Sequence, residues 1–155
     1  MNIFIRFLCC VGIVFLAAFI GNMATMPNIA EWYAVLQKPV FNPPNWIFGP
    51  VWTLLYLLMS ISLFLVWQAR TKINKRQAFT VFGAQLFLNV LWSIVFFGFH
   101  SPVGGLIVII ALLGMIAGTI KVVWPIHRVA AYLLVPYLAW VLFATILNIA
   151  IVALN

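Results

Sequence analysis

Acidic residues are almost absent from this sequence, since Glu31 is the only one in 155 residues. Catalysis by paired acids needs two carboxyl groups, one on each side of the bond that breaks. A single carboxylate side chain excludes it. The sequence also lacks a Ser/His/acid set and a glycine-rich loop that could cradle phosphate. Ordinary hydrolysis and group transfer are therefore not expected.

Charged residues of both signs are scarce. They make up 6% of the chain, whereas soluble domains carry about a quarter. Hydrophobic residues reach 67% and mean hydropathy is +1.23. This composition cannot cover a folded surface in water, so the solvent must be lipid. A transmembrane β-barrel is a poor fit, because its strands would alternate apolar and polar residues.

The apolar residues form five runs, each long enough to cross the hydrocarbon core as a helix of about 20 residues. We therefore predict an all-α membrane protein, a single domain of five transmembrane helices over 1–155. The first run could be a signal peptide with Arg6 as its short basic region, but the run is too long and lacks a clear cleavage site, which favours a retained helix. The expected spans are 4–25, 44–67, 78–99, 102–124 and 128–153.

The basic residues predict the orientation of this bundle. The N-terminus and the connections after the second and fourth spans hold seven of the eight, and only Lys38 falls on the other side. Positive residues prefer the cytoplasmic side, so we expect the N-terminus inside and the C-terminus outside. Because they lie at span ends rather than along one face, no nucleic-acid partner is expected. The seven residues are Arg6, Arg70, Lys72, Lys75, Arg76, Lys121 and Arg128.

The connection predicted over residues 26–43 is unusually long for a small bundle. Loops of this length are usually functional or disordered, and its Pro, Trp and Tyr content argues against disorder. We expect it to cap the outer end of the bundle.

The cysteines and histidines give no metal site. Cys9 and Cys10 are adjacent, so a disulfide between them is not expected. We interpret them as packing residues, with palmitoylation as the alternative. His100 and His127 fall on opposite sides of the membrane and are interpreted as solvated residues at the interface.

Polar and aromatic residues collect in the outer halves of three spans. Helical spacing puts Gln85, Asn89, Trp92 and Phe96 on one face. Similar faces carry Trp52 and Tyr56 in the second span, and Tyr137, Trp140, Ala144 and Asn148 in the fifth. Such faces can line one cavity. The alternatives are hydrogen bonds that only join helices and an aromatic belt at the membrane surface.

A cavity of this kind suits a large, flat, mostly apolar ligand with a polar edge. No obligatory cofactor and no metal is expected. The absence of an acid within the spans argues against ion coupling.

Three segments together resemble the TspO/MBR family of tryptophan-rich sensory proteins. They are WYAVLQKPVFNPPNWIFGPVWTLLYLLM at 32–59, AQLFLNVLWSIVFFG at 84–98 and VPYLAWVLFATILN at 135–148. The resemblance implies a five-helix bundle, often a homodimer, that binds porphyrins and benzodiazepine- or isoquinoline-type ligands beneath its first loop. It implies pocket roles for Trp52, Asn89, Trp92, Trp140, Ala144 and Leu147, and lid roles for Trp32 and Trp46.

The complete set of predicted ligand-binding residues combines the spacing argument with this resemblance. It comprises Asn22, Trp32, Trp46, Phe48, Trp52, Tyr56, Gln85, Asn89, Trp92, Phe96, Tyr137, Trp140, Ala144 and Leu147.

The expected function is a membrane receptor or sensor for porphyrin, with transport as an added role. The alternative is light-dependent porphyrin breakdown, in which the resemblance assigns Trp52 and Trp140 as the reacting side chains. Family members that bind cholesterol carry a Tyr and an Arg after the last span's ATxLN segment. Here Ile149, Ala150 and Ile151 follow, so no specific sterol site is expected.

The GxxxG pair Gly114 and Gly118 suits either a homodimer contact or packing within the chain. The expected location is a bacterial cell membrane, with an outer or organellar membrane as the alternatives.

Overall fold

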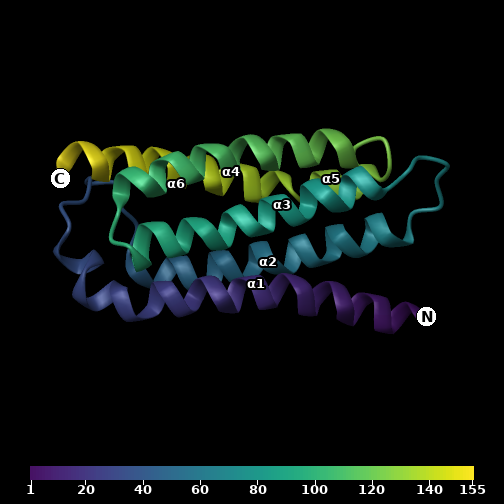
Figure 1. Ribbon diagram of the computed structural model, residues 1–155, viewed down its shortest axis with the longest axis horizontal. Coiled ribbons are helices and arrows are strands. Elements are labelled where there is room, and N and C mark those ends of the chain that lie inside the picture. Colours follow the sequence, from purple (N-terminus) through teal and green to yellow (C-terminus); the bar gives the residue numbers. More distant parts are fainter.

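The computed structural model describes all residues, 1–155, and contains five helical segments long and apolar enough to cross a membrane. They run side by side along the long axis of the molecule (Figure 1). The predicted all-α fold with five spans is confirmed. The elements are α1 (Ile3–Glu31), η1 (Tyr33–Val35), α2 (Asn45–Gln68), α3 (Arg76–Ser93), η2 (Ile94–Gly98), α4 (Pro102–Val123), α5 (Arg128–Tyr132) and α6 (Val135–Leu154).

Side-chain caps mark three of the helix starts. Asn2 Oδ1 accepts from the backbone N–H of Phe4, and Ser101 Oγ accepts from the backbone N–H of Gly104. His127 caps α5, because its Nδ1 accepts from the backbone N–H of Ala130 at 3.2 Å. These bonds satisfy donors that a helix leaves free in its first turn.

The first helix is longer than the sequence predicts. It continues past residue 25 to Glu31, with Pro27 inside it. Two side chains reinforce the backbone around this proline: Thr25 Oγ1 donates to the Gly21 carbonyl, and Asn28 Nδ2 donates to the Ala24 carbonyl at 2.8 Å. The prediction of a connection from residue 26 is therefore wrong, and the lid, defined here as residues 32–44, is shorter than expected.

Two other spans are interrupted. The fifth divides into α5 and α6 at Leu133 and Leu134, and Pro136 then occupies the first turn of α6, where its missing N–H removes no helical hydrogen bond. The third ends in a π-helical turn, η2, in which the N–H of Phe99 donates to the carbonyl of Ile94 at 2.9 Å.

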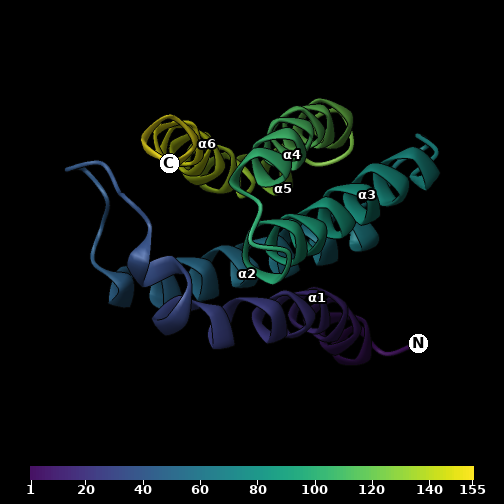
Figure 2. The same ribbon diagram turned by 60° about the vertical axis from the view of Figure 1, so that its left-hand side comes forward.

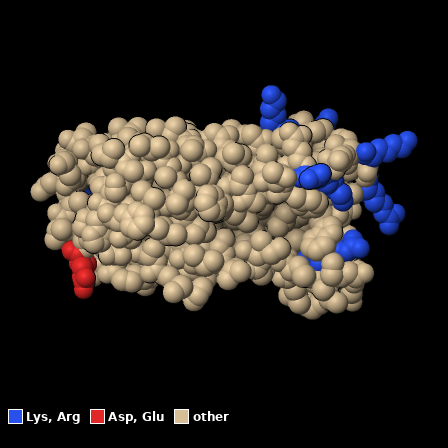
Figure 3. All heavy atoms as spheres, in the orientation of Figure 1, with Lys and Arg blue, Asp and Glu red and all other residues tan.

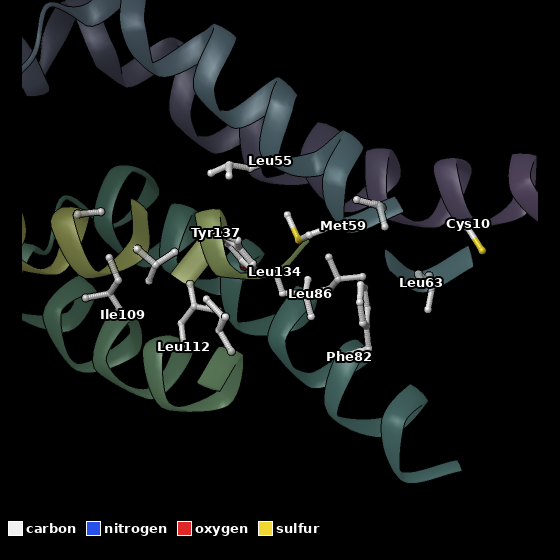
Figure 4. Packing of buried hydrophobic residues seen from close by; sticks show 14 residues of the cluster. Cys10, Leu55, Met59, Leu63, Phe82, Leu86, Ile109, Leu112, Leu134 and Tyr137 are labelled. Atoms are coloured by element: carbon white, nitrogen blue, oxygen red, sulfur yellow. The ribbon is translucent and has the colours of Figure 1, made fainter. Parts of the chain in front are cut away.

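The five spans pack in a closed ring, because α5, the first part of the fifth span, packs on α2. α3 packs on both α1 and α4, α4 packs on α6, and α1 packs on α2 (Figure 2). The main core lies between these helices and includes Met59, Phe82, Leu112 and Tyr137 (Figure 4). Cys10 belongs to this core, whereas its neighbour Cys9 is exposed.

Charge is segregated along the long axis. Except for Lys38 in the lid, the Lys and Arg side chains gather at the end that holds the N-terminus, and the single acidic side chain lies at the opposite end (Figure 3). This arrangement is the one that the positive-inside rule expects of a membrane protein with its N-terminus in the cytoplasm.

Candidate functional site

A cavity of about 870 Å³ lies in the half of the bundle away from the basic end. Its 26 lining residues come from α1, η1, α2, α3, η2 and α6. No Asp, Glu, Lys, Arg or His is among them. Its volume lies within the range of about 300–1,000 Å³ usual for sites that bind small molecules.

A short relay of hydrogen bonds crosses the inner end of the cavity. The Tyr56 hydroxyl donates to Asn89 Oδ1 at 2.8 Å, and Asn89 Nδ2 donates to the Tyr137 hydroxyl at 2.9 Å. Asn89 is only 3% exposed, and it joins α3 to both α2 and α6. The relay therefore joins three helices by hydrogen bonds, and two of its members, Tyr56 and Asn89, also face the cavity.

Trp92 is held in place by a second polar pair. Its indole N–H donates to Asn148 Oδ1 at 3.2 Å, and Asn148 Nδ2 donates to the Pro102 carbonyl at 2.9 Å. The Trp92 ring stacks on Phe96, with centroids 5.2 Å apart and planes 24° apart. A fixed aromatic face is thereby presented to the cavity.

The π-helical turn carries two consecutive residues, Phe96 and Phe97, that are both buried and both line the cavity. Such turns are frequent at functional sites. The π-helical turn can pack closely on α4 because α4 has a glycine, Gly105, at the point of contact. A Cβ atom at Gly105 would lie 2.8 Å from Phe96 Cδ2.

Aromatic contacts close the wall between α2 and α6. Trp52 stacks on Tyr56 with centroids 5.6 Å apart and meets Tyr137 edge-on at 6.3 Å. Phe48 meets Trp140 edge-on at 5.9 Å. The indole N–H of Trp140 is buried without a hydrogen-bond acceptor.

The lid is braced by its own side chains. Lys38 Nζ donates to the carbonyls of Tyr33 and Leu36, at 2.8 and 2.9 Å, and lies 4.9 Å from the centroid of the Tyr33 ring. The Tyr33 hydroxyl donates to Asn42 Oδ1 at 2.9 Å. Burial raises the pKa of Tyr33 to about 12, and the Asn42 hydrogen bond opposes this rise only in part.

Most of the predicted ligand-binding residues line this one cavity. Those that do are Asn22, Trp46, Phe48, Trp52, Tyr56, Asn89, Trp92, Phe96, Trp140, Ala144 and Leu147.

Three predicted residues lie outside the lining. Trp32 stacks instead on His100, with centroids 4.8 Å apart and planes 12° apart. Gln85 is one turn too deep, where its amide nitrogen lies 3.8 Å from Met59 Sδ. Tyr137 stands behind Asn89 as the last member of the relay. His100, expected to be solvated, is exposed but also lies 2.7 Å from Asn28 Oδ1.

Sequence reasoning missed nearly all of the wall that α1 contributes. Apart from Asn22, this wall carries small and apolar side chains whose chemistry does not distinguish them from lipid-facing residues. The sequence did contain one signal, Gly21, because small residues within a span allow two helices to approach closely. In the structure, a Cβ atom at Gly21 would lie 3.3 Å from Ser93 Oγ. The α1 residues of the wall are Phe15, Ala18, Phe19, Gly21, Asn22, Thr25, Met26 and Ile29.

Five apolar spans around an uncharged, aromatic cavity define an integral multi-pass membrane protein with an internal site of small-molecule size. Residues 10–154 match the TspO/MBR family, and the chain belongs to that family.

Relatives from three kinds of organism agree with this assignment. Identity is 47% with tryptophan-rich protein TspO of Archaeoglobus fulgidus, over 88% of this chain and 88% of the relative. It is 39% with the tryptophan-rich sensory protein of Cereibacter sphaeroides, over 81% and 77%. It is 36% with the translocator protein of Homo sapiens, over 86% and 80%.

Proposed function

We propose that this protein is a membrane receptor or sensor that binds porphyrins, and benzodiazepine- or isoquinoline-type compounds, in the cavity beneath the lid. The observation that carries the proposal is the cavity itself, which is about 870 Å³ in volume, walled by aromatic rings and free of charged side chains. A porphyrin is flat, wide and largely apolar, and such a wall can hold it by stacking.

The polar groups of the site suit the edge of that ligand. Tyr56 and Asn89 lie at the inner end of the cavity, and Asn22 lies along its side. Hydroxyl and amide groups can orient a heterocycle without requiring a compensating charge. Transport of the ligand is an added role, which the names of the translocator relatives favour.

Titration of the purified protein with protoporphyrin IX, followed by tryptophan fluorescence, tests this function. Replacing both Trp52 and Trp140 by alanine removes two cavity walls, and we expect affinity to fall at least about tenfold, the loss of about 1.4 kcal/mol. Trp124→Ala is the matched control, because Trp124 is partly exposed and does not line the cavity. Equal affinities for the double variant and the control would contradict the assignment.

A second candidate function is light-dependent breakdown of the bound porphyrin. The observation that favours it is that Trp52 and Trp140 line the same cavity, so both indoles can contact one ligand. Illumination of the complex should then cause a progressive loss of porphyrin absorbance that slows in Trp52→Phe and Trp140→Phe variants. An unchanged spectrum under light leaves the receptor function and removes the degradative one.

We further propose that the protein resides in a bacterial cell membrane as a homodimer, with its N-terminus in the cytoplasm. The segregation of basic residues to one end supports the orientation. Open space around Gly114 and Gly118 on α4 leaves room for a second copy to approach.

A further inference from the structure

The cavity is open on only one side. Seven of its lining residues are exposed, and all of them belong to α1 or α2. The lining residues of α3, η2 and α6 are all buried or half-buried. The exposed ones include Phe19 (62%), Met26 (61%) and Trp46 (74%). The full set is Phe19, Asn22, Met26, Asn45, Trp46, Gly49 and Thr53.

These residues form two stripes that face each other across the gap between α1 and α2. On α1 they recur as Phe19, Asn22 and Met26, and on α2 as Asn45, Gly49 and Thr53, at helical spacings of three or four. At Gly49 a Cβ atom would meet nothing within 4 Å. The α2 stripe therefore has no side chain at this position and has room for one.

The borders of this opening are closed by contacts. Phe15 meets Tyr56 at 6.2 Å between ring centroids and ends the opening on the inner side. On the side away from α2, α1 packs against α3, where Gly21 lies next to Ser93. Above, the lid is fastened to Asn155, whose side-chain amide bonds to the backbone of Gln37.

The opening lies at a depth where the protein meets acyl chains. Thr53 is eight residues along α2 from Asn45, which corresponds to about 12 Å of helix. Both flanking helices are apolar enough to span a membrane. A molecule that passes between them therefore comes from the hydrocarbon region rather than from water.

We infer that the gap between α1 and α2 is a lateral portal through which neutral, lipid-dissolved ligands enter and leave the cavity. The inference rests on the proposed binding function and adds the route and the ligand class. The cavity holds no cation to pair with a carboxylate, so an uncharged porphyrin ester suits both the portal and the site better than the free acid.

The test uses the full chain in phosphatidylcholine vesicles and protoporphyrin IX dimethyl ester as the probe. Stopped-flow quenching of tryptophan fluorescence gives the association rate, and dilution into empty vesicles gives the dissociation rate. Gly49→Phe fills the portal, and Thr53→Phe is a second variant on the same stripe. Gly83→Phe is the matched control, because it adds the same ring to an open position on α3 that does not line the cavity.

For both portal variants we expect association and dissociation to slow together by about tenfold or more, because an obstructed path changes rates more than equilibrium. The control Gly83→Phe should keep the wild-type rates. Asn155→Ala, which releases the lid, should also keep them.

Two results would overturn the inference. One is binding of the ester with unchanged rates in both portal variants. The other is faster association in Asn155→Ala, which would place the route through the lid. Failure of the wild-type protein to bind any porphyrin is a distinct outcome, which removes the proposed function and the portal with it.

Discussion

The side-chain amide of Asn155 forms two hydrogen bonds with the backbone of Gln37, one with its N–H and one with its carbonyl. Its Oδ1 accepts from the Gln37 N–H at 3.0 Å, and its Nδ2 donates to the Gln37 carbonyl at 2.9 Å. These two bonds fasten the lid to the end of α6, a segment 118 residues away in sequence.

Asn155→Ala should therefore loosen the lid without unfolding the bundle. A hydrogen bond contributes about 1 kcal/mol net, so protection of the Gln37 amide from hydrogen exchange should fall about fivefold or more. Asn2→Ala, which removes an exposed cap at the opposite end of the molecule, is the control and should leave lid exchange unchanged. Equal protection in both variants would show that the pair does not hold the lid.

Asn89→Leu should destabilise the bundle, because it leaves the buried Tyr137 hydroxyl and the Tyr56 hydroxyl without their shared partner. The expected loss is about 1–3 kcal/mol in unfolding free energy, the usual cost of an unsatisfied buried polar group. Thermal unfolding in detergent measures it. Combining Asn89→Leu with Tyr137→Phe should recover part of the loss, and strict additivity of the two changes would argue against the relay.

Gly105→Ala and Gly118→Ala form a matched pair on α4. At Gly105 the added Cβ would lie 2.8 Å from Phe96 Cδ2, whereas at Gly118 it would meet nothing within 4 Å. We expect the first to lower stability by about 1–3 kcal/mol through overpacking. The second should raise it by up to about 1 kcal/mol, since alanine favours helix. Equal shifts in melting temperature would contradict the close packing of the π-helical turn on α4.

Tyr33 should make the lid sensitive to alkali. Its pKa is raised from the ordinary 10.0 to about 12 by burial, so the folded lid favours the neutral phenol. This stabilisation is complete below pH 10 and is lost as pH rises from there through about 12, by at most about 2–3 kcal/mol. Hydrogen exchange of the lid across this interval, compared with Tyr33→Phe, measures the effect. An identical pH dependence in the variant would exclude Tyr33 as its cause.

The spans were predictable because hydrocarbon imposes a length and an apolar composition that few sequences meet by chance. The end of α1 was not. A proline such as Pro27 is typical of a helix boundary. Here α1 continues past it, and the hydrogen bonds from Thr25 and Asn28 to the helix backbone can be seen only in the structure.

Helical spacing grouped the right face of α3, but spacing gives neither depth nor the position of a neighbour. Asn89 and Trp92 line the cavity, whereas Gln85, on the same face, lies below it. The rim of the cavity on α1 could not be predicted either, because the exposed apolar residues Phe19 and Met26 look like any lipid-facing residues in the sequence.

The uncharged lining has a consequence for energetics across the membrane. Moving one elementary charge through a potential of 100 mV is worth about 2.3 kcal/mol, but a neutral ligand in a cavity without Asp, Glu, Lys, Arg or His moves no charge. Voltage can then neither drive nor oppose its passage. Occupancy of the proposed site would then follow only the chemical activity of the ligand in the surrounding lipid.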